Sequence, residues 1–252
     1  YTDDLLKELL NANAGLRQPG ARVSHVFLAD IPAYPKLLAI SDAAVNIAPD
    51  LSAKAAILQH AIDLMATIGV DLPKAAILSA VETVNPLISS SLDAAALSVM
   101  SHRGQVRGAL VDGPLAFDNA ISLKAAEVKG IASPVAGDAD ILLVPDLVSG
   151  NILAKNLEYM ADATLAGLVL GLNAPIVLPS RADPVNARLA GLALARLSLA
   201  AKARKSPPQD KVPVWPVHAT RSSPMSEVDC CPPSDPTPTS PTSLNGGAHA
   251  EP

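Results

Sequence analysis

The chain has 252 residues, of which 49% are apolar and 17% charged, and its formal net charge is −5. This composition is typical of a globular protein and argues against binding to nucleic acid or to an anionic membrane. With no run of ~18 uncharged apolar residues and no basic-then-apolar leader, it predicts a cytoplasmic protein without a membrane span. The only two cysteines, Cys230 and Cys231, are adjacent, which argues against structural zinc and a disulfide framework.

Strand and helix patterns alternate along the first two hundred residues. Apolar spacing predicts helices at residues 2–15, 52–68, 92–100, 115–128, 151–161 and 184–203. Three apolar runs occur early in the chain, at residues 23–29, 36–40 and 43–47. Strands are expected later, at residues 74–80, 108–111, 141–144, 165–170 and 176–178. Because strands separated by helices favour parallel crossover units, we expect an α/β fold with a mainly parallel sheet and helices on both faces.

The composition changes near Lys205. Residues 206–252 hold 11 of the 23 prolines. Such a segment buries too little apolar surface to offset its ordering entropy, so we expect residues 205–252 to form a disordered, proline-rich tail.

Polar residues follow three of the expected strands. Asp112 follows residues 108–111, Asp146 follows 141–144, and the segment 180–183 follows 176–178. Open α/β sheets carry their chemistry at the carboxyl ends of strands, so these three strand ends are expected to converge on one cleft. His25 lies inside an apolar strand, where a role lining a site and a role as a satisfied core histidine both stay open. No G-x-G-x-x-G, P-loop or G-x-S-x-G motif is present.

Several ordered motifs resemble one known family. The segments DGPLAFD (112–118), ADILLVPD (139–146), GNILAK (150–155) and PSRAD (179–183) are similar to motifs of phosphate acetyltransferases and phosphate butyryltransferases. The resemblance extends from Tyr1 to Ala203. It implies transfer of an acetyl or butyryl group between coenzyme A and inorganic phosphate, with coenzyme A as a substrate, no permanently bound cofactor and no metal. It also implies a homodimer whose partners are acyl-CoA and phosphate.

The resemblance further implies an isocitrate-dehydrogenase-like fold of two domains with the active site between them. Members are usually longer on the amino side, so the first domain is expected to be incomplete here. Residues 1–39 then represent its remnant, residues 40–170 the second domain, and residues 171–204 the return to the first.

The resemblance places catalysis on Ser180 and Arg181, and, through a gap, on Asp183. The residue chemistry suits this reaction, because a guanidinium matches phosphate, a hydroxyl can donate to an oxyanion and a carboxylate can accept a thiol proton. The alternative for Asp183 is a plain helix cap.

Five further residues are expected to bind substrate. Gly113 beside Asp112 would permit a close approach of backbone, and Asn151 and Lys155 lie one helical turn apart on the same face. The candidates are Arg22, Ser24, Asp112, Asn151 and Lys155. Asn46, Glu82 and Asn85 are weaker candidates.

Two other functions stay open from the sequence. One is a metal- and NAD-dependent dehydrogenase of the same fold, which requires a set of metal ligands. The other is a truncated, noncatalytic oligomerisation module.

Overall fold

The computed structural model describes residues 8, 11, 16–17, 20–180 and 182–203. Most of the helix expected at residues 2–15, Arg181 and the proline-rich tail lie outside the described residues. The elements within the described part are β1 (Ser24–Asp30), β2 (Leu38–Ser41), α2 (Leu51–Thr67), β3 (Lys74–Leu78), α3 (Ser89–His102), β4 (Leu110–Leu115), α4 (Phe117–Ile121), α5 (Leu123–Val128), β5 (Ile141–Leu143), α6 (Leu147–Met160), β6 (Thr164–Leu170), β7 (Ile176–Val177) and α7 (Val185–Ala203).

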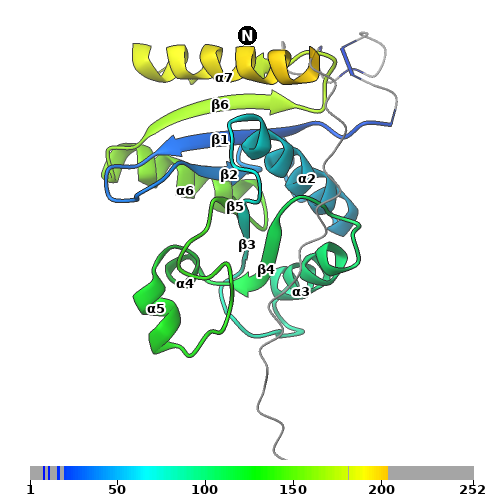
Figure 1. Cartoon of the computed structure of the whole chain (residues 1–252), viewed down its shortest axis with the longest axis vertical. Helices are drawn as coiled ribbons and strands as arrows, with labels where there is room; N and C mark the ends of the chain where they lie inside the picture. Colours follow the sequence, from blue (N-terminus) through cyan, green and yellow to red (C-terminus); the bar gives the residue numbers. More distant parts are fainter. Residues whose placement is uncertain (1–7, 9–10, 12–15, 18–19, 181, 204–252) are drawn as a thin grey trace, which may run out of the picture. The chain divides into compact units, whose positions relative to one another are not determined.

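All seven of these strands form one sheet in the order β4-β3-β5-β2-β1-β6-β7. The pairs β2·β5, β3·β5 and β3·β4 are parallel, whereas β1·β2, β1·β6 and β6·β7 are antiparallel. Figure 1 shows β1 and β6 side by side with their arrows in opposite directions. The expectation of a mainly parallel sheet is therefore wrong for half of the pairs. The connections 31–37 and 171–175 contain no helix, and a parallel pair requires a crossover of a dozen or more residues.

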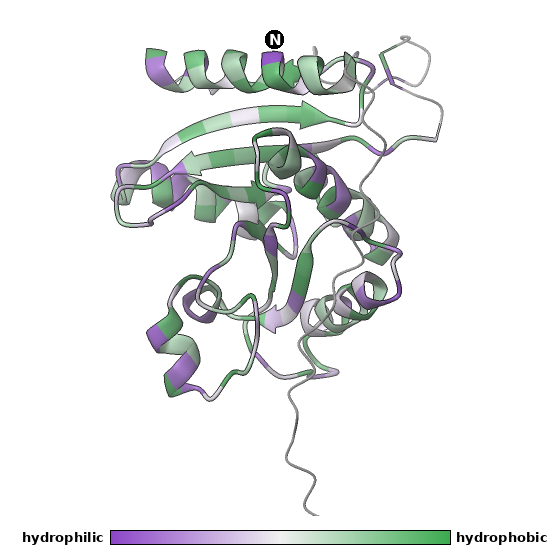
Figure 2. Ribbon diagram, in the orientation of Figure 1, coloured by the Kyte–Doolittle hydropathy of each residue, from purple (hydrophilic) through white to green (hydrophobic). Residues whose placement is uncertain are grey.

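Helices cover both faces of the sheet, as expected. Residues of α2, α3 and α7, such as Ile57, Leu97 and Leu194, form one core with the strands. The second core, on the other face, includes Ala126 of α5 and Ala154 of α6. Figure 2 shows that apolar residues are concentrated along β1 and β6, which lie between these layers. Burial on both faces explains why these strands read as continuous apolar runs.

Two boundaries differ from expectation around β4. The strand continues through Asp112 to Leu115, and the single helix expected at 115–128 is two helices. Ser122 separates them, because its hydroxyl accepts a hydrogen bond from the Ala125 N–H (3.3 Å) and so begins α5. The close backbone approach expected at Gly113 is confirmed, since an added Cβ would lie 2.7 Å from the Ile77 carbonyl oxygen.

α6 begins at Leu147, one turn before its expected start, because Asp146 caps it. The Asp146 Oδ1 accepts hydrogen bonds from the Ser149 N–H (2.8 Å) and hydroxyl (3.0 Å). This start brings Gly150 against the chain that follows β2. An added Cβ at Gly150 would lie 2.9 Å from the Asp42 carbonyl oxygen and 2.7 Å from the Val144 Cγ2.

Gly150→Ala should therefore destabilise the protein by about 1–3 kcal/mol, even though alanine is the better helix former. The backbone of residue 42 cannot move away without disturbing β2. Urea unfolding of this variant and of Asn156→Ala, an exposed position of the same helix, measures the difference. Equal stability of the two variants would show that the contact relaxes at no cost.

Candidate functional site

A pocket of about 560 Å³ lies where β3 and β5 end and where α3, α4 and α6 begin. We call it the carboxyl-edge pocket. Open α/β sheets typically bind ligands at this position. Its lining residues are Ala48, Lys54, Leu78, Ser79, Ala80, Ser89, Ser90, Phe117, Val144, Pro145, Asp146, Ser149 and Leu153.

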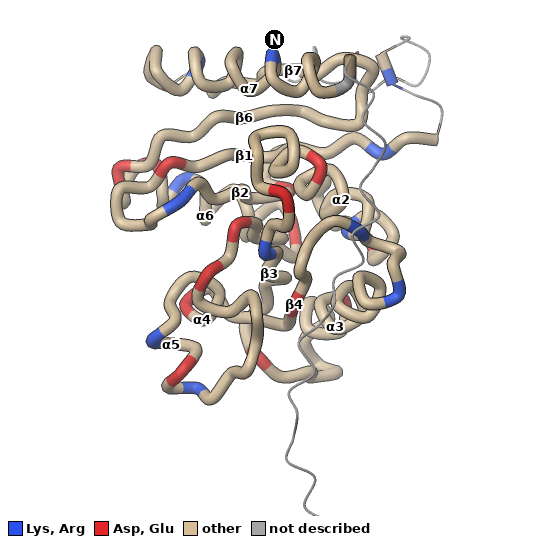
Figure 3. The backbone as a smooth tube through the Cα atoms, viewed as in Figure 1, with Lys and Arg blue, Asp and Glu red and all other residues tan. Residues whose placement is uncertain are grey.

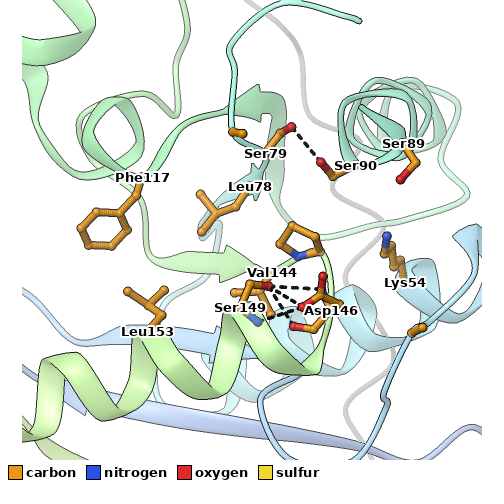
Figure 4. Close-up of a pocket in the computed structure, with 13 residues that line it drawn as sticks. Lys54, Leu78, Ser79, Ser89, Ser90, Phe117, Val144, Asp146, Ser149 and Leu153 are labelled. Atoms are coloured by element: carbon orange, nitrogen blue, oxygen red, sulfur yellow. Dashed lines mark hydrogen bonds between the residues drawn. The ribbon is translucent and has the colours of Figure 1, made fainter. Parts of the chain in front are cut away.

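The two ends of the carboxyl-edge pocket differ in chemistry. In Figure 4, Phe117, Leu78 and Leu153 lie at one end, and Lys54 and Ser89 lie at the other. The Ser79 and Ser90 hydroxyls lie 2.9 Å apart. The Lys54 ammonium contacts the Asp93 Oδ2 at 2.6 Å, and its side chain is only 8% exposed. The pocket thus suits a molecule with an apolar body and a polar head.

A buried carboxylate organises the loop after β2. One oxygen of Asp42 accepts hydrogen bonds from the N–H groups of Ala44 and Val45, both at 2.9 Å. The other accepts from the His25 N–H at 3.1 Å and from the Asn46 amide at 2.6 Å. The sequence analysis did not single out Asp42, although it follows an apolar run as the other strand-end aspartates do.

His25, whose backbone N–H bonds Asp42, lies in β1 and is completely buried. Both of its ring nitrogens are without a hydrogen-bond partner, and its ring packs against the edge of Phe27 with the centroids 4.3 Å apart. Burial lowers the pKa of His25 to about 4, although the Asp42 charge acts in the opposite direction. The ring is therefore neutral at physiological pH.

The three polar strand ends do not converge within the described residues. Asp146 lies at the carboxyl-edge pocket, but Asp112 lies inside β4. β7 runs antiparallel to β6 and therefore opposite in direction to β2 and β5. Ser180 and Asp183, which follow β7, thus lie toward the end of the sheet where β2 and β5 begin. The expectation of one shared cleft is wrong because it assumed that all strands run the same way.

Asp183 closes a tight turn with Ser180. Its Oδ2 accepts a hydrogen bond from the Ser180 N–H at 2.7 Å, and its own N–H donates to the Ser180 carbonyl at 3.2 Å. The carboxylate therefore holds the turn that carries Ser180. Arg181, between them, lies outside the described residues.

The residues expected to bind substrate lie in different elements and differ in burial. Arg22 is exposed at the start of β1, whereas Ser24 is buried, and its hydroxyl contacts the His60 Nδ1 at 2.8 Å. Asn151 is exposed on α6, and its amide lies 3.4 Å from the Ala43 carbonyl oxygen. Lys155, also on α6, pairs with Glu158 at 2.6 Å. Asn151 and Lys155 both lie in α6, one helical turn apart, as the sequence predicted.

Charges of both signs are interspersed over the described residues, as Figure 3 shows. Lys36 and Lys74 pair with Asp138 at 2.7 Å and 2.6 Å, and Lys36 also pairs with Asp140. Among the described residues, no group of three or more metal-ligating side chains gathers, and no helix is long and apolar enough to cross a membrane.

The fold and the carboxyl-edge pocket define an α/β protein with a ligand-sized pocket at the ends of parallel strands. A family model described as phosphate acetyl/butaryl transferase matches residues 2–195. The chain is 56% identical over 197 residues to a phosphate acetyltransferase of Rhizobium meliloti, covering 78% of this chain and 62% of that protein. It is 50% identical over 194 residues to a probable phosphate butyryltransferase of Bacillus subtilis, covering 77% and 64%.

Solved structures agree with this match. A branched-chain phosphotransacylase from Enterococcus faecalis superposes with a TM-score of 0.71 at 35% identity, covering 79% of this chain and 71% of that one. The chain therefore belongs to the phosphate acetyl/butyryl transferase family, which confirms the resemblance found in the sequence. It spans 62% and 64% of the two curated relatives described above.

Proposed function

We propose that the protein transfers an acyl group, acetyl or butyryl, between coenzyme A and inorganic phosphate. The observation that carries this proposal is the 56% identity to a phosphate acetyltransferase over 78% of the chain. Relatives of both acyl preferences match at high identity, which supports the reaction type more strongly than a choice of acyl group. The same match favours acyl transfer over the dehydrogenase and the noncatalytic module.

The proposed chemistry uses the turn after β7. In the direction that consumes acyl phosphate, the Asp183 carboxylate accepts the thiol proton of coenzyme A. The sulfur then attacks the carbonyl carbon, a C–S bond forms, and the C–O bond to phosphate breaks. The Ser180 hydroxyl donates to the oxyanion, and the Arg181 guanidinium binds the departing phosphate. The Asp183–Ser180 hydrogen bond supports this assignment because it places both groups in one turn.

Substrate binding is proposed for Arg22, Ser24, Asp112, Asn151 and Lys155. Exposure of Arg22 and Asn151 suits this role. Ser24 has less support than these two, because its hydroxyl is buried and contacts the His60 Nδ1. No permanently bound cofactor enters the proposed reaction, because acyl-CoA and phosphate supply all the reacting atoms.

The finer architecture is also proposed: a cytoplasmic homodimer whose subunits have an isocitrate-dehydrogenase-like fold of two domains. Residues 1–39 and 171–204 are assigned to the first domain and residues 40–170 to the second. Apolar side chains on the outer face of α7 support a further layer over this helix, since Val185, Leu189 and Leu192 are 72%, 60% and 59% exposed.

An assay of the natural full-length protein tests the reaction. Thioester absorbance should fall with acetyl-CoA or butyryl-CoA only when phosphate is present. Loss of thioester at the same rate without phosphate, or no loss with either substrate, would reject the proposal.

Arg181→Lys should keep the charge at this position but lose the planar pair of donors that matches phosphate. We expect a raised Michaelis constant for phosphate, a lower turnover, or both, with unchanged thermal unfolding. Steady-state kinetics against phosphate and acyl-CoA separately measures the effect. Unchanged constants for both substrates would remove Arg181 from the site.

A further inference from the structure

We infer that the carboxyl-edge pocket binds a small amphiphilic carboxylate, an anion with a short apolar chain, at a site separate from the acyl-transfer residues. Nothing in this inference depends on the reaction proposed above. It rests on the volume of the pocket, the contrast between its ends and the position of one nearly buried ammonium group.

The apolar end fits a short hydrocarbon chain. Leu78, Val144 and Leu153 form its walls with Phe117, whose side chain lies at the end away from Lys54 in Figure 4. A volume of about 560 Å³ lies within the range of pockets for small molecules. Contact with these side chains removes apolar ligand surface from water, which favours binding by roughly 25 cal/mol per Å².

The polar end fits a carboxylate. The Lys54 ammonium has three N–H donors, and within the described residues one acceptor, the Asp93 Oδ2, contacts it at 2.6 Å. The Ser89 and Ser90 hydroxyls line the same end and are able to donate. A carboxylate at this position receives a charge-assisted hydrogen bond from the Lys54 ammonium and hydrogen bonds from these hydroxyls.

A second carboxylate, Asp146, also lines the pocket. Asp146 lies at the first turn of α6, where its Oδ1 already accepts hydrogen bonds from Ser149 and where the helix dipole offsets its charge. Asp93 is 29% exposed, so solvent is able to screen its charge when an anion approaches Lys54. An anionic head is therefore accommodated at the Lys54 end.

The site is separate from the proposed acyl-transfer residues by topology. The pocket lies at the carboxyl ends of β3 and β5. Ser180 and Asp183 follow β7, which runs in the opposite direction, so they lie toward the amino ends of β3 and β5. A ligand in the pocket also contacts α6 at Ser149, two residues before Asn151. It therefore touches the helix that carries two of the proposed substrate-binding residues.

Isothermal titration of the 252-residue chain with hexanoate tests the inference. We expect saturable binding with a Kd on the order of 1 mM, which is reasonable for so few ligand atoms. Hexanamide has the same shape without the charge, and it should bind about 10- to 100-fold more weakly, because its neutral carbonyl oxygen is a weaker acceptor for the Lys54 ammonium. Lys54→Met should weaken hexanoate by a similar factor and hexanamide by less.

A pair of matched variants locates the site. Ala80→Phe, at an exposed lining position, should fill the pocket and abolish binding, whereas Ala132→Phe, at an exposed position outside the lining, should have no effect. The inference is overturned by the absence of saturable hexanoate binding, by equal affinities for hexanoate and hexanamide, or by full affinity in Ala80→Phe. Displacement of hexanoate by inorganic phosphate would show instead that the pocket belongs to the acyl-transfer site.

Discussion

Replacing Asp183 by asparagine should lower turnover by about 10²–10⁴-fold and leave the melting temperature unchanged. Asparagine keeps a side-chain oxygen that accepts the Ser180 N–H, so the turn of residues 180–183 is preserved. It removes the carboxylate that is proposed to accept the thiol proton. The thioester assay and a thermal melt of the same variant separate these two roles.

Asp183→Ala is the matched control. It removes the hydrogen bond to Ser180 as well as the carboxylate, so it should also lower stability by about 0.5–2 kcal/mol. If the asparagine variant retains full turnover while the alanine variant is less stable, Asp183 serves only the turn. The base would then be sought among other aspartates, such as Asp112, Asp118 and Asp146.

Acidification should destabilise the protein by about 3 kcal/mol through His25 alone. The pKa of this ring is about 4 in the folded protein and 6.5 in its ordinary state. Between these values the unfolded chain binds a proton that the folded protein excludes, so stability is complete above pH 6.5 and falls as the pH approaches 4. The physical cause is the cost of charging a buried ring.

Urea unfolding above pH 6.5 and near pH 4 measures this loss. His25→Leu should remove most of the pH dependence in this window, whatever its effect on absolute stability, because no titrating ring remains. His102→Gln, at an exposed position, should keep the dependence. A slope that is the same in all three proteins would contradict the assignment to His25.

Element type followed from the sequence more readily than strand direction did. The helix α2 shows clear helical spacing, and β1 and β6 are apolar runs of the right length, so each was predicted nearly to its ends. Direction depends on whether a helix intervenes, and the connection 31–37 does not contain one. A strand that is buried on both faces has the same apolar sequence pattern whether it is parallel or antiparallel to its neighbours. Apolar patterning therefore carries no information about strand direction.

The carboxyl-edge pocket was not predicted, because its polar residues are spread along the chain. Lys54 reads as an ordinary lysine in a helical pattern, and Ser79 and Ser90 are common residues at element ends. Only the tertiary structure brings these three side chains together. Asp146 and the segment 180–183 were singled out because each closely follows an apolar run, a local signal that needs no knowledge of contacts.

The pairing of β1 also has a consequence for synthesis of the chain on the ribosome. β1 is an interior strand whose two neighbours are made at very different times, because β2 follows within a few residues whereas β6 ends at Leu170, the partner of Ser24. Until Leu170 has emerged, the apolar edge of β1 has no partner from its own chain. Unpaired edges of this kind recruit other strands. The nascent chain thus carries this unpaired edge throughout the interval between the completion of β1 and the completion of β6.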